Sequence, residues 1–153
     1  METRVELAER SVRFMKLLPA EDDKILVTLK GHLLIEELIT EILNVSLSGN
    51  NPINISVSER SQYANKLELC WAFNEKKLNE EFWASLKHLN EIRNAMAHRI
   101  EPIGVDEKIQ KFCASVLPKS EFNKADYQGR ELSFSIAWVH IVLSQTLHTI
   151  KNS

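Results

Sequence analysis

Residues that interrupt helices are scarce in this chain, which has four glycines and four prolines among its 153 residues. Glycine and proline disfavour a helix interior most strongly, so their scarcity predicts long uninterrupted helices. Apolar residues make up 44% of the chain, and its length is sufficient for a real hydrophobic core. The composition therefore predicts an all-α fold.

Cysteine is also scarce, and the two cysteines, Cys70 and Cys113, have no nearby partner in the sequence. Each falls on an apolar face, which favours buried reduced thiols over a disulfide or a metal-binding pair. A reducing compartment is therefore expected. The chain does not open with a charged segment followed by an apolar run and a cleavage site, so we expect a cytoplasmic protein.

An excess of positive charge is absent, since the formal net charge is −2. Proteins that coat nucleic acid through a broad positive surface neutralise many phosphates, and the net charge argues against that class. A small local basic patch remains compatible with the composition.

An unbroken apolar run of about 20 residues, the length that spans a bilayer, is lacking as well. The most apolar stretch covers residues 131–150, but serines, His140, Gln145 and His148 interrupt it. Alternation around residues 133–136 would suit a short strand, whereas about 20 residues without a breaker favour a helix. We expect a helix that is buried in the core or at a subunit interface.

The length suits a single domain covering residues 1–153. Apolar periodicity predicts a bundle of five or six helices, with a long central helix pair and an apolar C-terminal helix. The expected helices cover residues 2–18, 23–47, 58–73, 79–99, 105–118 and 131–150. Residues 48–58 are rich in turn formers and are expected to form a loop, although Ile53, Ile55 and Val57 alternate as in a short strand.

Local signals mark the ends of these helices. The expected N-caps are Asp22 or Asp23, Ser58 and Asn79, whose side chains can accept a hydrogen bond from the first turn. Pro19 and Pro102 are expected to end the first and fourth helices.

Apolar stripes mark the faces that we expect to be buried. Three helices show them most clearly, and the residues concerned are Val5, Ala8, Val12 and Met15; Leu26, Leu29, Leu33, Leu38, Ile39, Ile42 and Leu43; and Val105, Ile109, Phe112, Cys113 and Val116. The tryptophans Trp71, Trp83 and Trp138 also lie on apolar stripes and are expected in the core rather than stacked on nucleobases.

The segment of residues 89–99 places Arg93 and His98 near the end of an otherwise apolar helix. An arginine can hold a phosphate through two parallel hydrogen bonds, and histidine is the side chain whose pKa lies closest to neutral pH. The helix leads in with an apolar stripe of Phe82, Leu86, Leu89, Ile92 and Met96. Such a pair is suited to handling phosphate and could cut RNA without a metal.

This segment resembles the HEPN superfamily, all-helical domains of about this size. Their hallmark is an arginine, usually followed by a polar residue, and then four to six residues to a histidine; Arg93, Asn94 and His98 match the shortest version. HEPN toxins that are silenced by nucleotide transfer carry a tyrosine two places after the histidine, where this chain has Ile100. Inhibition by modification at that place is therefore excluded.

The resemblance implies endoribonuclease chemistry, in which the RNA 2′-hydroxyl attacks its own phosphate and expels the 5′-oxygen. His98 would serve as acid and base, Arg93 would stabilise the charged phosphorane, and Asn94 would orient His98 or a phosphate oxygen. No metal or other cofactor is required. The implied setting is a homodimer with one shared active site, in a toxin–antitoxin or phage-defence system, with RNA as substrate and an antitoxin or regulatory protein as a further partner.

The spacing of Arg93 and His98 leaves their geometry open. Residues advance about 100° each along an α-helix, so side chains five apart diverge by about 140°. The two groups converge through the long arginine side chain, through a loosened last turn, or through a second subunit that brings its own pair.

Structural roles compete with each of these assignments. His98 could cap the helix, Asn94 could bond nearby backbone, and Arg93 could pair with Glu36, Glu37 or another acid. The rival function is a non-catalytic helical module, similar to the mannitol-operon repressor, that dimerises or binds another protein through its final apolar helix. A transcriptional regulator would belong to that class.

Overall fold

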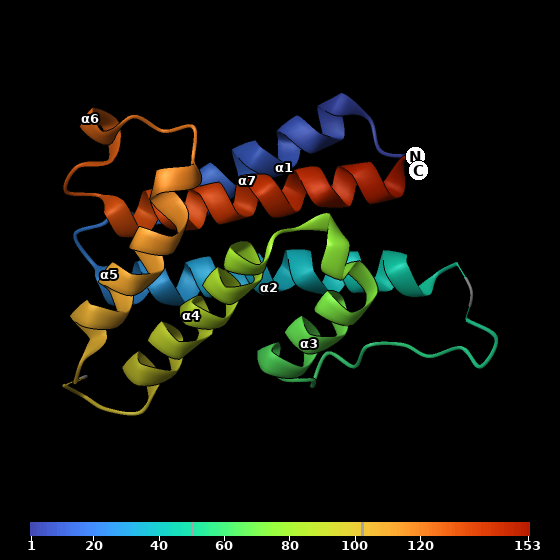
Figure 1. The fold of residues 1–153 in the computed structure, drawn as a ribbon, viewed down its shortest axis with the longest axis horizontal. Coiled ribbons are helices and arrows are strands. Elements are labelled where there is room, and N and C mark those ends of the chain that lie inside the picture. Colours follow the sequence, from blue (N-terminus) through green and yellow to red (C-terminus); the bar gives the residue numbers. More distant parts are fainter. Residues whose placement is uncertain (50, 102) are drawn as a thin grey trace.

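The computed structural model describes residues 1–49, 51–101 and 103–153 and contains seven α-helices and two short 3-10 helices there, with no strand (Figure 1). The α-helices are α1 (Arg4–Leu17), α2 (Lys24–Leu47), α3 (Tyr63–Asn74), α4 (Glu80–Ala97), α5 (Val105–Val116), α6 (Lys124–Tyr127) and α7 (Glu131–Lys151). The 3-10 helices are η1 (Glu75–Lys77) and η2 (Leu117–Lys119). The predicted all-α bundle is confirmed; the short α6 is the helix that the sequence did not indicate.

The two longest helices, α2 and α7, lie side by side through the middle of the molecule and form the long central pair (Figure 1). Helices α3 and α4 pack on α2, α1 packs on α7, and α5 contacts both α4 and α7. This arrangement explains the surplus of apolar surface in α7, because neighbouring helices cover it on several sides. The apolar final helix is therefore part of the core.

A close approach joins the two central helices at Gly31 of α2. A Cβ placed on Gly31 would lie 2.8 Å from Cδ1 and 2.9 Å from Cγ2 of Ile136 on α7. Ile136 is fully buried, and the position of its Cγ2 is fixed by the stiff χ1 angle of a β-branched side chain. Glycine at position 31 thus permits an approach that any side chain would obstruct.

Two of the predicted N-caps hold their helices as expected. The Asp23 carboxylate accepts a hydrogen bond from the Leu26 N–H at 3.0 Å, and the Asn79 side chain accepts one from the Phe82 N–H at 2.8 Å. The third prediction was wrong: α3 begins at Tyr63, and the Ser58 hydroxyl accepts from the Arg60 N–H in a turn before it.

The loop between α2 and α3 is confirmed over its described part, where Ile53, Ile55 and Val57 form no strand. Asn50 within this loop, and Pro102, which was expected to end the fourth helix, lie outside the described residues. Helix α4 itself ends at Ala97.

The predicted burial was wrong at Leu26, Leu33 and Trp71, whose side chains are exposed.

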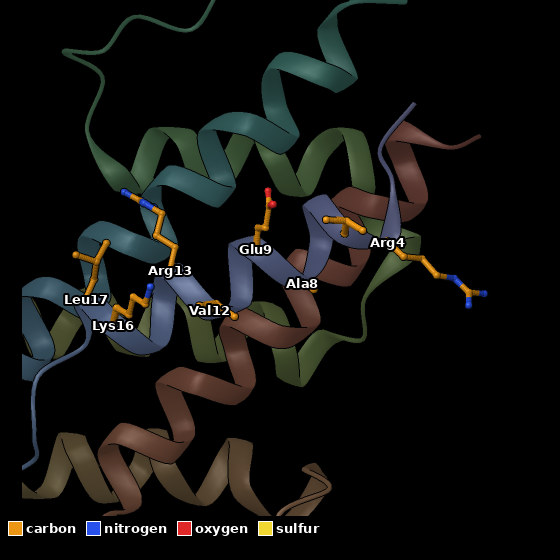
Figure 2. Close-up of a pocket in the computed structure, with 8 residues that line it drawn as sticks. Arg4, Ala8, Glu9, Val12, Arg13, Lys16 and Leu17 are labelled. Carbon is orange, nitrogen blue, oxygen red and sulfur yellow. The ribbon is translucent and has the colours of Figure 1, made fainter.

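The apolar stripe of α1 faces outward, so its prediction as a buried face was wrong. The exposed fractions of Val5, Val12 and Met15 are 66%, 50% and 76%. Charged side chains flank this stripe along a shallow groove of about 700 Å³. In Figure 2 the Glu9 and Arg13 side chains extend from the same helix as Ala8 and Val12, and the Arg4 side chain points away from them. The stripe is an apolar surface without a partner in the described part of the chain.

The opposite face of α1 is buried by more specific contacts. Phe14 stacks on His140 of α7 with ring centroids 4.1 Å apart, and Arg10 donates a hydrogen bond to the Ser144 hydroxyl at 2.8 Å. The buried Glu2 carboxylate pairs with Arg10 and with His148. These contacts determine which face of α1 packs against α7. They also hold the two ends of the chain next to each other, as Figure 1 shows.

None of the helices within the described residues is both long enough and apolar enough to cross a membrane.

We expect Gly31→Ala to lower the free energy of unfolding by about 1–3 kcal/mol, because the added methyl group overpacks the contact with Ile136. Alanine is the better helix former by about 1 kcal/mol, so a loss of stability in this variant would isolate the packing effect. Urea unfolding followed by circular dichroism measures it. Gly49→Ala, where nothing lies within 4 Å of the new methyl group, serves as the control.

The loss of unfolding free energy caused by Gly31→Ala should be smaller in an Ile136→Ala background, because the obstructing side chain is absent there. Equal stability of Gly31→Ala and the wild type would show that the helices are not held this closely.

A second stability effect should arise at His140. Burial, followed by the nearby Arg10 and Arg13, lowers the pKa of this imidazole to about 4, while Glu37 opposes the shift. In the unfolded chain a histidine has a pKa of about 6.5, so between about pH 6.5 and 4 only the unfolded state binds this proton. Above this pH range His140 does not lower the free energy of unfolding. Within the range, the free energy of unfolding falls with decreasing pH by at most about 1.4 kcal/mol per pH unit because of this group.

The measurement is the difference in unfolding free energy between the wild type and His140→Leu, followed from pH 7 to pH 4. We expect the advantage of the wild type to decrease as the pH falls. Other titrating groups cancel in this difference, so a constant value would contradict the assignment.

Candidate functional site

The predicted motif occupies the last turn of α4. Ile92 and Met96 are buried and anchor this turn, while Arg93 and Asn94 are partly exposed. His98 is the C-cap, with φ −95° and ψ −9°, and is exposed. The apolar stripe thus fixes the helix end against the core and leaves the three polar side chains accessible.

These three side chains line one pocket of about 500 Å³, which we call the motif pocket. Its walls come from α2, α3, α4 and the approach to α3, and its residues are His32, Glu36, Ser61, Gln62, Tyr63, Ala64, Asn90, Arg93, Asn94 and His98. Arg93 and His98 share this pocket within a single chain, because His98 lies beyond the regular helix and the arginine side chain is long. A second subunit is not needed to bring them to the same pocket.

Arg93 is not neutralised by an acid within the described residues. Its Nη1 donates a hydrogen bond to the Asn94 side-chain oxygen at 3.3 Å. The acids that were considered as partners pair elsewhere: Glu36 lies 3.8 Å from Lys66, and Glu37 accepts from Arg13 at 2.8 Å. The guanidinium therefore keeps donors for an anion, and Asn94 is engaged with Arg93 rather than with His98.

Asn90 extends the motif in a way that the sequence analysis missed. Asn90, Asn94 and His98 follow each other at intervals of four residues, which places them in one row on the helix surface. This spacing was present in the sequence and could have identified Asn90. Its side-chain oxygen lies 3.0 Å from Nε2 of His32 on α2.

His32 and Tyr63 form the inner wall of the motif pocket. Their rings are tilted by 33° to each other with centroids 4.3 Å apart, and the Tyr63 hydroxyl donates to the Leu86 carbonyl of α4 at 2.9 Å. Burial lowers the pKa of His32, so its ring stays neutral near pH 7. No signal near the motif points to these two residues, because only the packing of α2 and α3 on α4 brings them there.

The amino end of α3 also opens onto the motif pocket, through Ser61, Gln62, Tyr63 and Ala64. Gln62 is the N-cap but makes no side-chain capping hydrogen bond. The first N–H groups of a helix lack partners within the helix and carry partial positive charge. Arg93 and the end of α3 therefore direct positive potential into the same pocket.

The remaining candidate groups lie outside the motif pocket. His88 is partly buried, and its Nδ1 makes no hydrogen bond and lies 3.6 Å from Glu91. Burial raises the pKa of Cys70 to about 12 and that of Cys113 to about 11, so both buried thiols are unreactive near neutral pH. The described residues hold no group of three or more histidine, cysteine or acidic side chains arranged to bind a metal.

Comparison with family models, curated proteins and solved structures finds no match for this chain. The likeness to HEPN domains therefore stays a prediction that rests on Arg93, Asn94 and His98 in an all-helical fold.

Proposed function

We propose that this protein is a metal-independent endoribonuclease of the HEPN type, acting in a toxin–antitoxin or phage-defence system. The observation that supports it is the motif pocket, where Arg93, which forms no ion pair within the described residues, shares one space with the exposed His98 and with the end of α3, which has no side-chain cap. Helix N-termini and arginine are both typical ligands of phosphate groups. A phosphodiester bound there would lie beside an imidazole that can move protons.

Each side chain has a role in this chemistry. Arg93 binds the phosphate and stabilises the negative charge that grows on the phosphorane oxygens. Asn94 accepts a hydrogen bond from Arg93 and so restricts where the guanidinium points. His98 transfers the proton of the attacking 2′-hydroxyl or of the leaving 5′-oxygen.

Cleavage requires an acid and a base at the same time, and the motif pocket offers one accessible histidine. The other imidazole, His32, is buried and engaged with Asn90. A homodimer that brings two copies of His98 to one phosphodiester would supply both groups. We therefore include a composite dimer site in the proposal.

We expect the wild type to cleave RNA in EDTA and to leave DNA intact, since the 2′-hydroxyl is the nucleophile. His98→Ala should reduce the rate by about 10²- to 10⁴-fold, the usual value of a proton-transfer group. Arg93→Ala should reduce it by about 10²- to 10³-fold through the loss of charge stabilisation. Gel analysis of structured and unstructured RNA measures these rates.

Lys87→Ala is the matched control, because it removes an exposed positive charge from α4 outside the motif pocket. Circular dichroism and sedimentation confirm that each variant keeps its fold and oligomeric state. Equal cleavage by all the variants would expose a contaminating nuclease. Absence of cleavage by the wild type on every RNA would reject the enzyme.

The exposed apolar stripe of α1 favours a second candidate function, a non-catalytic dimerisation module or transcriptional regulator. The rival hypothesis placed its interface on the final helix, but most of the apolar surface of α7 is buried. The apolar stripe of α1 instead has the spacing of apolar residues in helices that pair with one another. Its residues, at alternating intervals of three and four, are Val5, Ala8, Val12 and Met15. The occupant under this candidate is a second copy of the same chain.

Val12→Glu distinguishes the two candidates by analytical ultracentrifugation. A dimer formed through α1 should dissociate in this variant, because a charge would be buried in the centre of the apolar stripe. A dimer formed around the motif pocket should persist, since that pocket is built from α2, α3 and α4. Ala84→Glu, which adds the same charge to an exposed position of α4, is the control.

A further inference from the structure

We propose that the inner part of the motif pocket binds one guanine base of the RNA, beside the phosphate to be cleaved. Glu36 and Asn90 would recognise the Watson–Crick edge of this base. The inference rests on the proposed ribonuclease function and names the nucleotide that the same site selects.

The motif pocket has two ends with different chemistry. Asn90 on α4 and His98, the C-cap of this helix, are eight residues apart, which corresponds to about 12 Å along a helix axis. Asn90 contacts His32 on α2, whereas His98 lies past the last residue of α4, and Arg93 lies between them along the chain. The Glu36 carboxylate repels phosphate, so we expect it to contact a part of the ligand that donates hydrogen bonds.

Glu36 has free acceptor capacity. Its side chain is 22% exposed, and its Oε2 lies 3.8 Å from the Lys66 ammonium, too far for a hydrogen bond. Within the described residues, neither carboxylate oxygen accepts a hydrogen bond. A partly buried carboxylate of this kind is suited to accept from a ligand.

Asn90 is oriented by His32. A neutral imidazole has one N–H, and the contact at 3.0 Å between His32 Nε2 and Asn90 Oδ1 uses it as the donor. The Asn90 amide oxygen accepts this bond, and its NH₂ group donates no hydrogen bond within the described residues. His32 and Glu36 are four residues apart on α2, so they are neighbours on one face, and Glu36 lines the same pocket as Asn90.

One donor beside a carboxylate complements guanine. The Watson–Crick edge of guanine presents the O6 acceptor followed by two adjacent donors, N1–H and the N2 amino group. Adenine, cytosine and uracil do not present two adjacent donors, so a carboxylate can form its paired hydrogen bonds only with guanine. An extruded base is commonly recognised through this edge.

The experiment titrates the 3′- and 5′-monophosphates of guanosine, adenosine, cytidine and uridine into the wild type and His98→Ala, followed by NMR. We expect the guanine nucleotides to bind roughly 5- to 150-fold more tightly, the usual discrimination of a good bidentate contact. Glu36→Gln should abolish this preference. Glu37→Gln, which removes the neighbouring charge outside the motif pocket, should retain it.

A second measurement maps the cleavage sites in a randomised RNA. Guanine enriched next to the cut in the wild type, and lost in Glu36→Gln, supports the inference. Cleavage without a base preference overturns the guanine site and leaves the ribonuclease in place. Guanine-selective binding by a protein that cleaves no RNA overturns the ribonuclease alone, and equal or absent binding of the four nucleotides overturns the guanine site.

Discussion

The close approach of α2 and α7 at Gly31 and Ile136 is the contact on which the rest of the bundle depends. It allows two long helices to bury continuous apolar faces against each other, and the other long helices then pack on this pair. The residue after Gly31 is His32, the inner wall of the motif pocket. Close packing of the central helices therefore also sets the position of the α2 side chains at the candidate site.

Arg93 forms no ion pair within the described residues, although the Glu36 carboxylate lines the same pocket. The chain carries slightly more acidic than basic residues, yet neither Glu36 nor Glu37, the acids considered as partners of Arg93, pairs with it. Glu37 pairs with Arg13 of α1, and Glu36 lies nearest to the buried Lys66 of α3. An arginine that is unpaired within the described residues is compatible with a net charge of −2, because the distribution of charge rather than its sum determines what a pocket presents to a ligand.

Helix α1 shows where periodicity alone misleads. Its sequence offers two faces, one a regular apolar stripe and the other containing Phe14 and Arg10. The second face is buried, because Phe14 stacks on the ring of His140 and Arg10 pairs with Glu2 and donates a hydrogen bond to Ser144. These partners lie on α7 and at the start of the chain, so the local pattern contained no information about them.

The sequence by itself determined most of the helices and the grouping of Arg93, Asn94 and His98 at the end of one of them. Helix formation depends on local features of the sequence. These features are the scarcity of glycine and proline, the N-caps Asp23 and Asn79, and the apolar stripe that precedes Arg93 and His98. Only the tertiary structure decided which face of α1 is buried and which side chains complete the motif pocket. His32, Glu36 and Tyr63 are distant from the motif in sequence and reach it through the packing of α2 and α3, which depends on the shapes of all the contacting faces at once.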